Sequence, residues 1–210
     1  VVLGALYGAD PVREVWRRVT AVVLAAGESR RMGRNKLLLP WDDTTVLGRT
    51  LANVAASNVA DVLVVTGHNR HEIESVASRQ DIVTTFNQSY AKGMLSSVQT
   101  AIRSLPAAVK AVLIMLGDQP LVPTQLIDEL LQAYAASPHG LIAPIYEGRR
   151  GNPVIIDRRY FTELLALPED SAPRALLQRH PDYLLLVEVE NDAVLHDLDR
   201  PEDYERLRPR

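Results

Sequence analysis

Short runs of Val, Ile and Leu alternate along this chain with longer segments in which apolar residues recur every three or four positions. The short runs predict buried strands, and the spaced segments predict helices that cover them. We expect strands at Thr20–Ala26, Asp61–Thr66, Ile82–Phe86, Lys110–Leu116, Leu141–Tyr146, Val154–Asp157 and Tyr183–Val189. We expect helices at Val46–Ala55, His71–Arg79, Met94–Leu105, Tyr160–Leu167 and Pro173–Gln178, another from Thr124 that ends before Ser137, and a last one from Pro201.

The alternation of strands and helices predicts the fold class. Strands joined by helices pair in parallel through right-handed crossovers, which gives a three-layer α/β structure with a mostly parallel sheet. Several short strands follow one another around Tyr146–Asp157, so we expect a small antiparallel addition there. In such sheets ligands bind at the carboxyl ends of strands. That rule points to the residues from Gly27 onward, to Gly117–Pro120 and to the turn near Asp199.

Length and composition narrow the function classes. The chain has 210 residues, of which 47% are apolar and 23% charged, as in an ordinary globular domain. We expect one domain over residues 19–210 and treat residues 1–18 as an extension outside it. The net charge of −3 does not indicate a nucleic-acid partner, so any anion site must be built locally. No apolar stretch approaches the roughly 20 residues that a membrane span requires.

Cysteine is absent from the sequence. Its absence excludes disulfides, thiolate zinc sites, iron–sulfur clusters and cysteine nucleophiles, and it fits a reducing compartment. The apolar start, Val1–Ala9, lacks the basic region and the cleavage pattern of a secretory signal. We therefore expect a cytoplasmic protein.

The most informative segment is Leu24–Pro40, LAAGESRRMGRNKLLLP. A buried strand runs into a glycine-bearing loop that holds four cations, Arg30, Arg31, Arg34 and Lys36. Close backbone approach and several fixed cations are what a phosphate ester requires, although a solvated basic loop would show the same composition. The spacing differs from that of a Walker loop, because Lys36 is followed by Leu37 rather than by Ser or Thr.

Acidic residues follow at two places. Asp118 comes directly after a buried apolar run, in the segment GDQP, where a carboxylate can hold a hard divalent cation. Asp197 and Asp199 stand one strand period apart in DLDRPEDY. Asp is also a common turn and helix-capping residue, so each position has a structural interpretation as well. Two further candidates are Asn87–Ser97, suited to hydrogen bonding a base or ribose, and the basic turn Gly148–Pro153.

Together these motifs resemble the molybdenum cofactor cytidylyltransferases, which belong to a wider group of nucleotidyltransferases. The resemblance rests on LAAG-x-S-x-RMG-x-x-K-LLLP, N-x-x-Y-x-x-GM-x-SS, GDQP, GRRGNP and DLD-R-PEDY, in the family's order over about residues 19–208. It implies a Rossmann-like nucleotidyltransferase fold. It also implies a magnesium-dependent reaction in which CMP passes from CTP to the terminal phosphate of molybdenum-bound molybdopterin and pyrophosphate leaves.

The resemblance also assigns roles to residues of this chain. It places the nucleotide along Leu24, Ala25, Ala26 and Gly27, with the base beside Ser96 and Ser97. Arg31 and Lys36 would neutralise the triphosphate, Asp118 and Asp199 would hold Mg²⁺ with Asp197 as a helper, and Arg31, Lys36 and Asp118 form the catalytic set. The acceptor would face Arg149, Arg150, Gly151 and Asn152. A molybdenum hydroxylase or its maturation factor is the implied protein partner.

The resemblance also bears on the choice of base. Guanylyltransferase relatives carry LAGG where this chain has LAAG, so the Ala26 methyl narrows the space beside the base and favours a pyrimidine. Two positions depart from the family pattern: Leu95 replaces a serine and Asn152 replaces a histidine. Another phosphorylated acceptor, such as a sugar or polyol phosphate, is one alternative. A non-catalytic cofactor carrier is the other, although it would have no use for Lys36, Asp118 and Asp199.

Overall fold

One mixed sheet of eight strands forms the centre of the computed structural model, which describes residues 19–169 and 171–209. The strand order is β10-β7-β9-β6-β1-β4-β5, with β8 paired to β7. The bounds are β1 Val19–Ala25, β4 Asp61–Thr66, β5 Val83–Phe86, β6 Ala111–Leu116, β7 Leu141–Tyr146, β8 Arg149–Arg150, β9 Val154–Asp157 and β10 Leu184–Glu188. The residues 1–18, predicted to be an extension, lie outside the described range.

The pairing directions confirm a mostly parallel sheet with an antiparallel addition. Strands β5, β4, β1 and β6 are parallel neighbours, and β10 is parallel to β7. Strand β9 is antiparallel to both β6 and β7, and the short β8 is antiparallel to β7. The reversal therefore falls in the segment where the short strands follow one another, as the sequence predicts.

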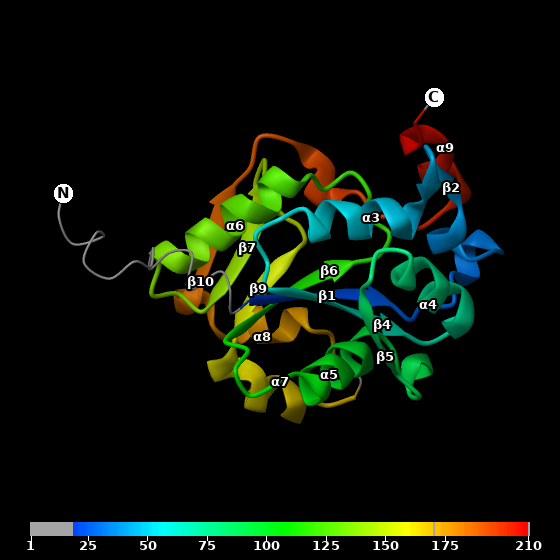
Figure 1. Cartoon of the computed structure of the whole chain (residues 1–210). Coiled ribbons are helices and arrows are strands. Elements are labelled where there is room, and N and C mark those ends of the chain that lie inside the picture. Colours follow the sequence, from blue (N-terminus) through cyan, green and yellow to red (C-terminus); the bar gives the residue numbers. More distant parts are fainter. Residues whose placement is uncertain (1–18, 170, 210) are drawn as a thin grey trace, which may run out of the picture.

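Helices cover both faces of the sheet (Figure 1). Helices α3 (Val46–Ala55), α4 (Arg70–Ser78) and α6 (Thr124–Ala136) share one hydrophobic cluster. Helices α5 (Met94–Ser104), α7 (Phe161–Ala166) and α8 (Arg174–Arg179) share the other. Strand β1 alternates between them, with Ala21 and Val23 in the first cluster and Val22 in the second. This is the three-layer arrangement that the alternating elements predict.

A third, smaller cluster joins segments from both ends of the described chain. It consists of Met32, Leu39, Trp41, Val46, Leu198 and Tyr204. A hairpin of β2 (Pro40–Trp41) and β3 (Thr44–Thr45) packs there against helix α9 (Pro201–Leu207). The Tyr204 hydroxyl donates to the carbonyl of Pro40 at 2.6 Å, and the Trp41 and Tyr204 rings lie 6.4 Å apart. The cluster brings the turn before α9 over the loop that follows β1.

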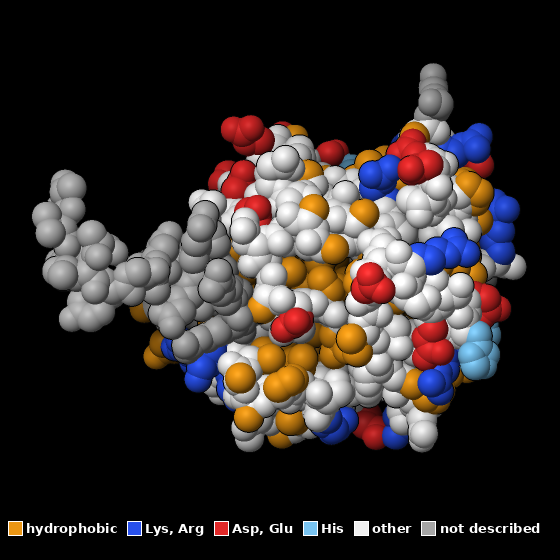
Figure 2. All heavy atoms as spheres, in the orientation of Figure 1, with side chains coloured by type: hydrophobic (Ala, Val, Ile, Leu, Met, Phe, Trp, Pro, Cys, Tyr) orange, Lys and Arg blue, Asp and Glu red, His pale blue; other side chains and the backbone are white. Residues whose placement is uncertain are grey.

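The surface is mixed in charge. Acidic and basic side chains are interspersed on the face seen in Figure 2, and apolar side chains gather near its middle. In the part of the chain that the structure describes, no helix has the length and apolar character needed to cross a membrane.

Candidate active site

The loops after β1 and β6 meet because these two strands are parallel neighbours in register. Leu24 stands opposite Leu116, and the Gly117 N–H donates to the Leu24 carbonyl at 3.0 Å. A Cβ atom on Gly117 would lie 3.0 Å from that carbonyl oxygen, so glycine permits this close approach. The glycine loop and Asp118 therefore open into the same space.

A cavity of about 310 Å³ lies at this edge of the sheet. Among the residues predicted for the site, its walls contain Leu24, Ala26, Gly27, Lys36, Ser97, Asp118, Asp197 and Asp199. Its other wall residues are Ser29, Leu37, Tyr90, Gly93, Met94 and Leu116. The structure thus brings the three strand-end regions that the sequence singles out into one cavity.

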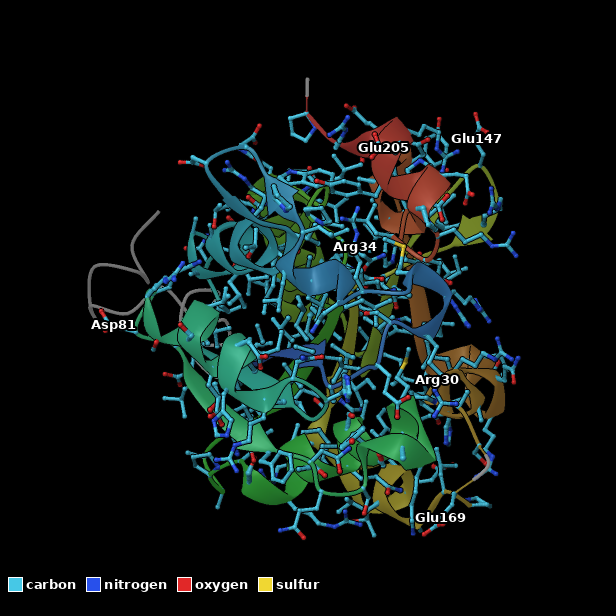
Figure 3. All side chains as sticks on the ribbon, turned by 90° about the vertical axis from the view of Figure 1, so that its right-hand side faces the viewer. Arg30, Arg34, Asp81, Glu147, Glu169 and Glu205 are labelled. Carbon is cyan, nitrogen blue, oxygen red and sulfur yellow. The ribbon has the colours of Figure 1, made fainter. Side chains whose placement is uncertain are left out.

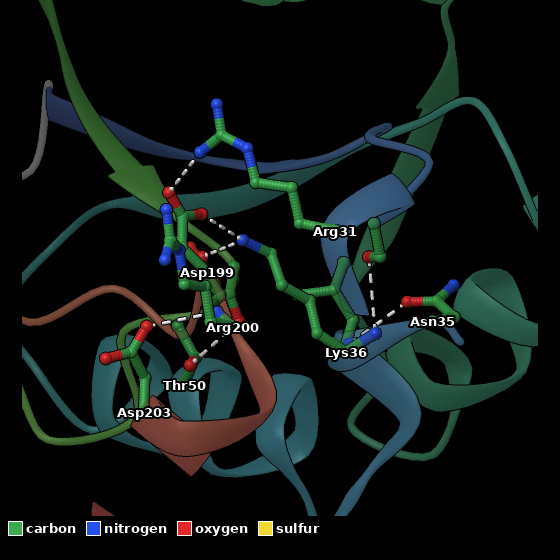
Figure 4. A network of polar contacts seen from close by, with 11 residues as sticks. Arg31, Asn35, Lys36, Thr50, Asp199, Arg200 and Asp203 are labelled. Atoms are coloured by element: carbon green, nitrogen blue, oxygen red, sulfur yellow. Dashed lines mark hydrogen bonds and ion pairs between the residues drawn. The ribbon is translucent and has the colours of Figure 1, made fainter. Parts of the chain in front are cut away.

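Lys36 joins the two acidic segments of this cavity (Figure 4). Its Nζ atom lies 2.5 Å from Oδ2 of Asp118 and 2.9 Å from Oδ1 of Asp199. The other oxygen of Asp199 accepts from the exposed Arg31 guanidinium at 3.2 Å. The Asp118 side chain is only 8% exposed, whereas that of Asp199 is 47% exposed. One buried and one accessible carboxylate therefore share a single ammonium group.

The charges in the cavity perturb one another. Burial disfavours the charged form of Lys36, but attraction to Asp118 and hydrogen bonds to both carboxylates outweigh it and raise its pKa. The Lys36 hydrogen bond lowers the pKa of Asp199. Burial raises the pKa of Asp197, and the charges of Asp118 and Asp199 add to that effect. The carboxylates of the cavity thus favour the charged form of Lys36.

The loop between β1 and Lys36 is shaped by two short polar side chains. Ser29 adopts a left-handed backbone with φ 53°, and its Oγ accepts from the Lys36 N–H at 3.2 Å. Asn35 caps the following turn, Lys36–Leu38, by accepting from the Leu37 N–H at 3.0 Å. These contacts aim Lys36 into the cavity.

The loop cations do not act as one group. Arg30 and Arg34 are exposed and labelled in Figure 3. Arg30 pairs with Glu28, and both arginines line a separate surface hollow beside His68. Only Lys36 and Arg31 contact the acidic residues of the cavity. The sequence could not separate the four cations, because they share one short segment.

The turn that carries Asp118 is held by helix α3. The Thr50 hydroxyl, fully buried, donates to the carbonyl of Gly117 at 3.1 Å. The Asn53 side-chain amide donates to the carbonyls of Pro120 and Val122, each at 3.0 Å. The sequence analysis did not identify either residue, because polar positions on an amphipathic helix carry no sign of what they contact.

Ser96 and Ser97 line two different pockets. Asn87 is buried and its Nδ2 donates to Ser96 Oγ at 2.8 Å and to Ser97 Oγ at 3.0 Å. Ser97 lines the cavity, whereas the Ser96 hydroxyl donates to the carbonyls of Ser89 and Gly93 and lines a neighbouring pocket. The Ala25 side chain packs in the core on the face of the sheet opposite to that of Ala26. The structure therefore brings Ser97, but not Ser96 or the Ala25 side chain, to the cavity.

The segment predicted to bind the acceptor lies outside the cavity walls. Arg149 and Arg150 form β8 and are exposed. Gly151 donates to the Pro144 carbonyl, and the Asn152 N–H donates to the Val194 carbonyl, each at 3.0 Å. Val194 belongs to the turn Asp192–Leu195, which leads directly to Asp197. The hairpin of β7 and β8 is thus attached to the segment that carries Asp197 and Asp199 rather than to the loop after β1.

Residues 21–183 match the model of the MobA-like NTP transferase domain. The chain belongs to this family. It is a nucleotidyltransferase, and it is similar to the molybdenum cofactor cytidylyltransferase of Escherichia coli, with 29% identity over 89% of this chain and 93% of that protein. Purine catabolism protein PucB of Bacillus subtilis is 27% identical over 89% of this chain and 94% of its own length.

Solved structures agree with the fold of this nucleotidyltransferase. The crystal structure of an rv0371c homolog from Mycobacterium sp. strain JC1 superposes with a TM-score of 0.79 at 28% identity, over 91% of this chain and 95% of that one. Rv0371c of Mycobacterium tuberculosis H37Rv in complex with manganese has a TM-score of 0.73 at 25% identity, over 90% of this chain and 97% of its own. The Rossmann-like nucleotidyltransferase fold is therefore confirmed.

The donor atoms of the cavity suit a hard divalent cation. Among the described residues, no three His, Cys, Asp or Glu side chains are grouped as a metal-ligand set. Two carboxylates, those of Asp118 and Asp199, nevertheless face one point, and the Lys36 ammonium occupies it. Carboxylate oxygens are the protein ligands that Mg²⁺ and Mn²⁺ prefer. The residues present therefore fit such an ion once the ammonium moves aside.

Proposed function

We propose that this nucleotidyltransferase transfers CMP from CTP to the terminal phosphate of a molybdopterin-type acceptor, with Mg²⁺ as the cofactor. The observation that carries the proposal is the convergence of Lys36, Asp118 and Asp199 in a cavity walled by the loop after β1. The identity of the acceptor rests on the similarity to the Escherichia coli cytidylyltransferase and on the motifs shared with that family.

The nucleotide would lie along Leu24, Ala26 and Gly27, with Ser97 near the base. These four residues all line the cavity. The backbone of Gly67 packs closely against Ala26, since a Cβ atom built on Gly67 would lie 2.7 Å from the Ala26 Cβ. A methyl group beside the base favours the smaller pyrimidine, which supports CTP as the donor.

The reaction needs little covalent chemistry from the protein. A phosphate acceptor is already an anionic nucleophile, so no side chain has to remove a proton from it. Lys36 and Arg31 would align the triphosphate and offset the charge that develops on the departing pyrophosphate. Asp118 and Asp199 would hold the divalent ion, which when bound withdraws charge from the phosphate oxygens. Catalysis would thus come from positioning and charge.

The acceptor would approach from the side of β8. Arg149 and Arg150 are exposed cations, and their hairpin is bonded to the turn that leads to Asp197. An anionic pterin phosphate held by these arginines would reach the acidic end of the cavity. Gly151 and Asn152 fix this hairpin through their backbone N–H groups.

Pyrophosphate release with each of the four nucleoside triphosphates, with and without molybdopterin, tests the proposal. We expect release only when CTP, Mg²⁺ and molybdopterin are all present. Pyrophosphate release with CTP and a sugar or polyol phosphate, but not with molybdopterin, would show that the acceptor is that phosphate instead. Tight binding of molybdopterin with no release from any triphosphate would indicate a cofactor carrier and would refute the proposed reaction.

A further inference from the structure

One ammonium group fills the point at which the acidic segments of the cavity converge. Lys36 Nζ is within 2.9 Å of a carboxylate oxygen on both Asp118 and Asp199. We propose that Lys36 is the resident counter-ion of the metal site: it occupies the cation position without nucleotide and leaves it when a divalent ion enters with the triphosphate. The inference rests on the proposed function for its nucleotide and for the divalent ion at Asp118 and Asp199, but it does not depend on which nucleotide or acceptor reacts.

Charge balance explains why a resident cation is needed. The Asp118 side chain is almost fully buried, and Asp197 and Asp199 line the same cavity. A buried carboxylate without a partner is costly, and negative charges that line one cavity repel one another. The Lys36 side chain is itself only 18% exposed and lies between two of them. The lysine therefore stabilises the acidic group before any ligand arrives.

The ammonium and a divalent ion exclude each other from this position. An ion that bridges the two carboxylates would take the oxygen atoms that Lys36 now contacts, Oδ2 of Asp118 and Oδ1 of Asp199. A second cation within about 4 Å of the first is strongly repelled in the protein interior. A triphosphate supplies the negative charge that lets both cations remain in the cavity. Metal binding is therefore weak by itself and strong together with nucleotide.

The geometry allows only the end of Lys36 to move. Its backbone N–H is bonded to Ser29 Oγ, and its carbonyl accepts from the Leu39 N–H at 3.3 Å. The flexible four-carbon stem lines the cavity and can turn within it. Arg31 contacts only the outer oxygen of Asp199 and is 73% exposed, so it does not block the shared position. The exchange thus requires movement of the Lys36 side chain alone.

Manganese binding without nucleotide tests the exchange. The variant is Lys36→Met, and the matched control is Lys110→Met. Lys110 is exposed and directly precedes the start of β6, whereas Asp118 follows the end of that strand. Counting free Mn²⁺ by electron paramagnetic resonance should show binding about tenfold tighter or more in Lys36→Met, because the competing cation is gone. Lys110→Met should match the unmodified protein. Equal or weaker binding in Lys36→Met would overturn the proposal.

The location of the added affinity is checked by a second substitution. Asp118→Asn in the Lys36→Met background should remove the gain, because a ligand of the shared position is lost. A gain that persists in this double variant would mean that the ion binds elsewhere, and the proposal would fail.

The unmodified protein provides a measurement that does not depend on how the variants fold. Lysine acetylation, followed residue by residue by mass spectrometry, should be slow at Lys36 without metal. Saturating Mn²⁺ should speed it at Lys36 and leave Lys110 unchanged. No change at Lys36 would refute the exchange.

Neither measurement requires turnover. If the exchange occurs but CTP is not used, the proposed reaction fails and the exchange stands. If CTP is used but Lys36 neither competes with Mn²⁺ nor changes in reactivity, only the exchange fails.

Discussion

Asn53 holds Pro120 in place: its side-chain amide donates a hydrogen bond to the Pro120 carbonyl at 3.0 Å. The same nitrogen donates to the carbonyl of Val122, also at 3.0 Å, and the Thr124 hydroxyl donates back to the Asn53 carbonyl at 2.8 Å. The turn beside Asp118 is therefore tied to helix α3 through both the side chain and the backbone of one residue.

Replacing Asn53 by alanine should weaken both the fold and the reaction. Two carbonyl groups would lose their donor, which should lower the free energy of unfolding by about 1–2 kcal/mol. The turnover number should fall as well, because Asp118 is held less firmly. Urea unfolding and pyrophosphate release measure the two effects. Asn58→Ala is the control, since Asn58 bonds Asp128 on the surface. Wild-type turnover in Asn53→Ala would contradict this role.

Asp118→Asn should reduce turnover by about 100-fold or more, the scale expected when one fixed charge contact of an active site is lost. The amide keeps the shape of the side chain but does not hold a divalent ion well. Circular dichroism should show an unchanged fold. Asp61→Asn, at the exposed start of β4, should keep full activity. If Asp118→Asn turned over at the rate of the unmodified protein, Asp118 would not be a metal ligand.

Ala26→Gly should relax the choice of nucleotide. Removing a methyl group from the wall beside the base should raise the ratio of kcat/KM for GTP over CTP by about tenfold. Ala25→Gly is the matched control, because that side chain packs in the core on the opposite face of the sheet. The control should lose stability without changing the ratio. An unchanged ratio in Ala26→Gly would show that this methyl does not select the base.

Replacing both Arg149 and Arg150 by glutamine should raise KM for the acceptor severalfold and leave KM for CTP unchanged. The two arginines lie on β8, outside the walls of the cavity that holds Lys36 and Asp118. Initial rates measured while each substrate is varied in turn separate the two constants. A rise in KM for CTP alone would place these residues on the nucleotide instead.

Asp157 should make stability depend on pH. Burial raises its pKa, but hydrogen bonds from the Arg159 backbone N–H and the Tyr134 hydroxyl, at 2.9 and 2.7 Å, hold it below the ordinary value. The unfolded state therefore takes up the proton first as pH falls. The stabilisation is complete above the ordinary carboxyl pKa of about 4 and is lost as pH falls through the lower folded value.

Asp157→Asn tests this dependence. It should lower the free energy of unfolding by about 1–2 kcal/mol at neutral pH, and the difference from the unmodified protein should shrink in acid. Tyr134→Phe removes one of the donors and should show part of the same trend. Urea unfolding at a series of pH values gives both results. A difference that stays constant down to the acid limit would rule out this carboxyl as the cause.

The sequence predicted the long elements well because each has a face that must be buried. Strand β6 has five buried residues in succession and was expected within one residue of its bounds. The hairpin of β2 and β3 was missed, because strands of two residues are too short to show an alternation of apolar and polar residues. Strand β10 begins at Leu184 rather than Tyr183, since Pro181–Tyr183 forms a short 3₁₀ turn.

The sequence predicted the residues of the cavity only where they directly follow the end of a strand or a recognisable turn. Lys36, Asp118 and Asp199 each follow a strand end or a turn that the sequence marks. Tyr90 and Met94 line the same cavity, and they belong to the candidate segment Asn87–Ser97, but neither was assigned a role of its own. Their place depends on how the segment before α5 packs against β1, which is a tertiary contact with no local pattern. The roles of all these residues in catalysis stay predictions until the variants are measured.

Asp118 and Asp199 belong to parts of the molecule with unequal resistance to opening. The first follows β6, a strand enclosed by both large cores, whereas the second follows Leu198 in the small cluster around Trp41 and Tyr204. Small clusters open at lower free-energy cost than the main core. Gentle warming would therefore separate the two carboxylates while the sheet is still intact, and loss of catalysis would come before loss of the fold.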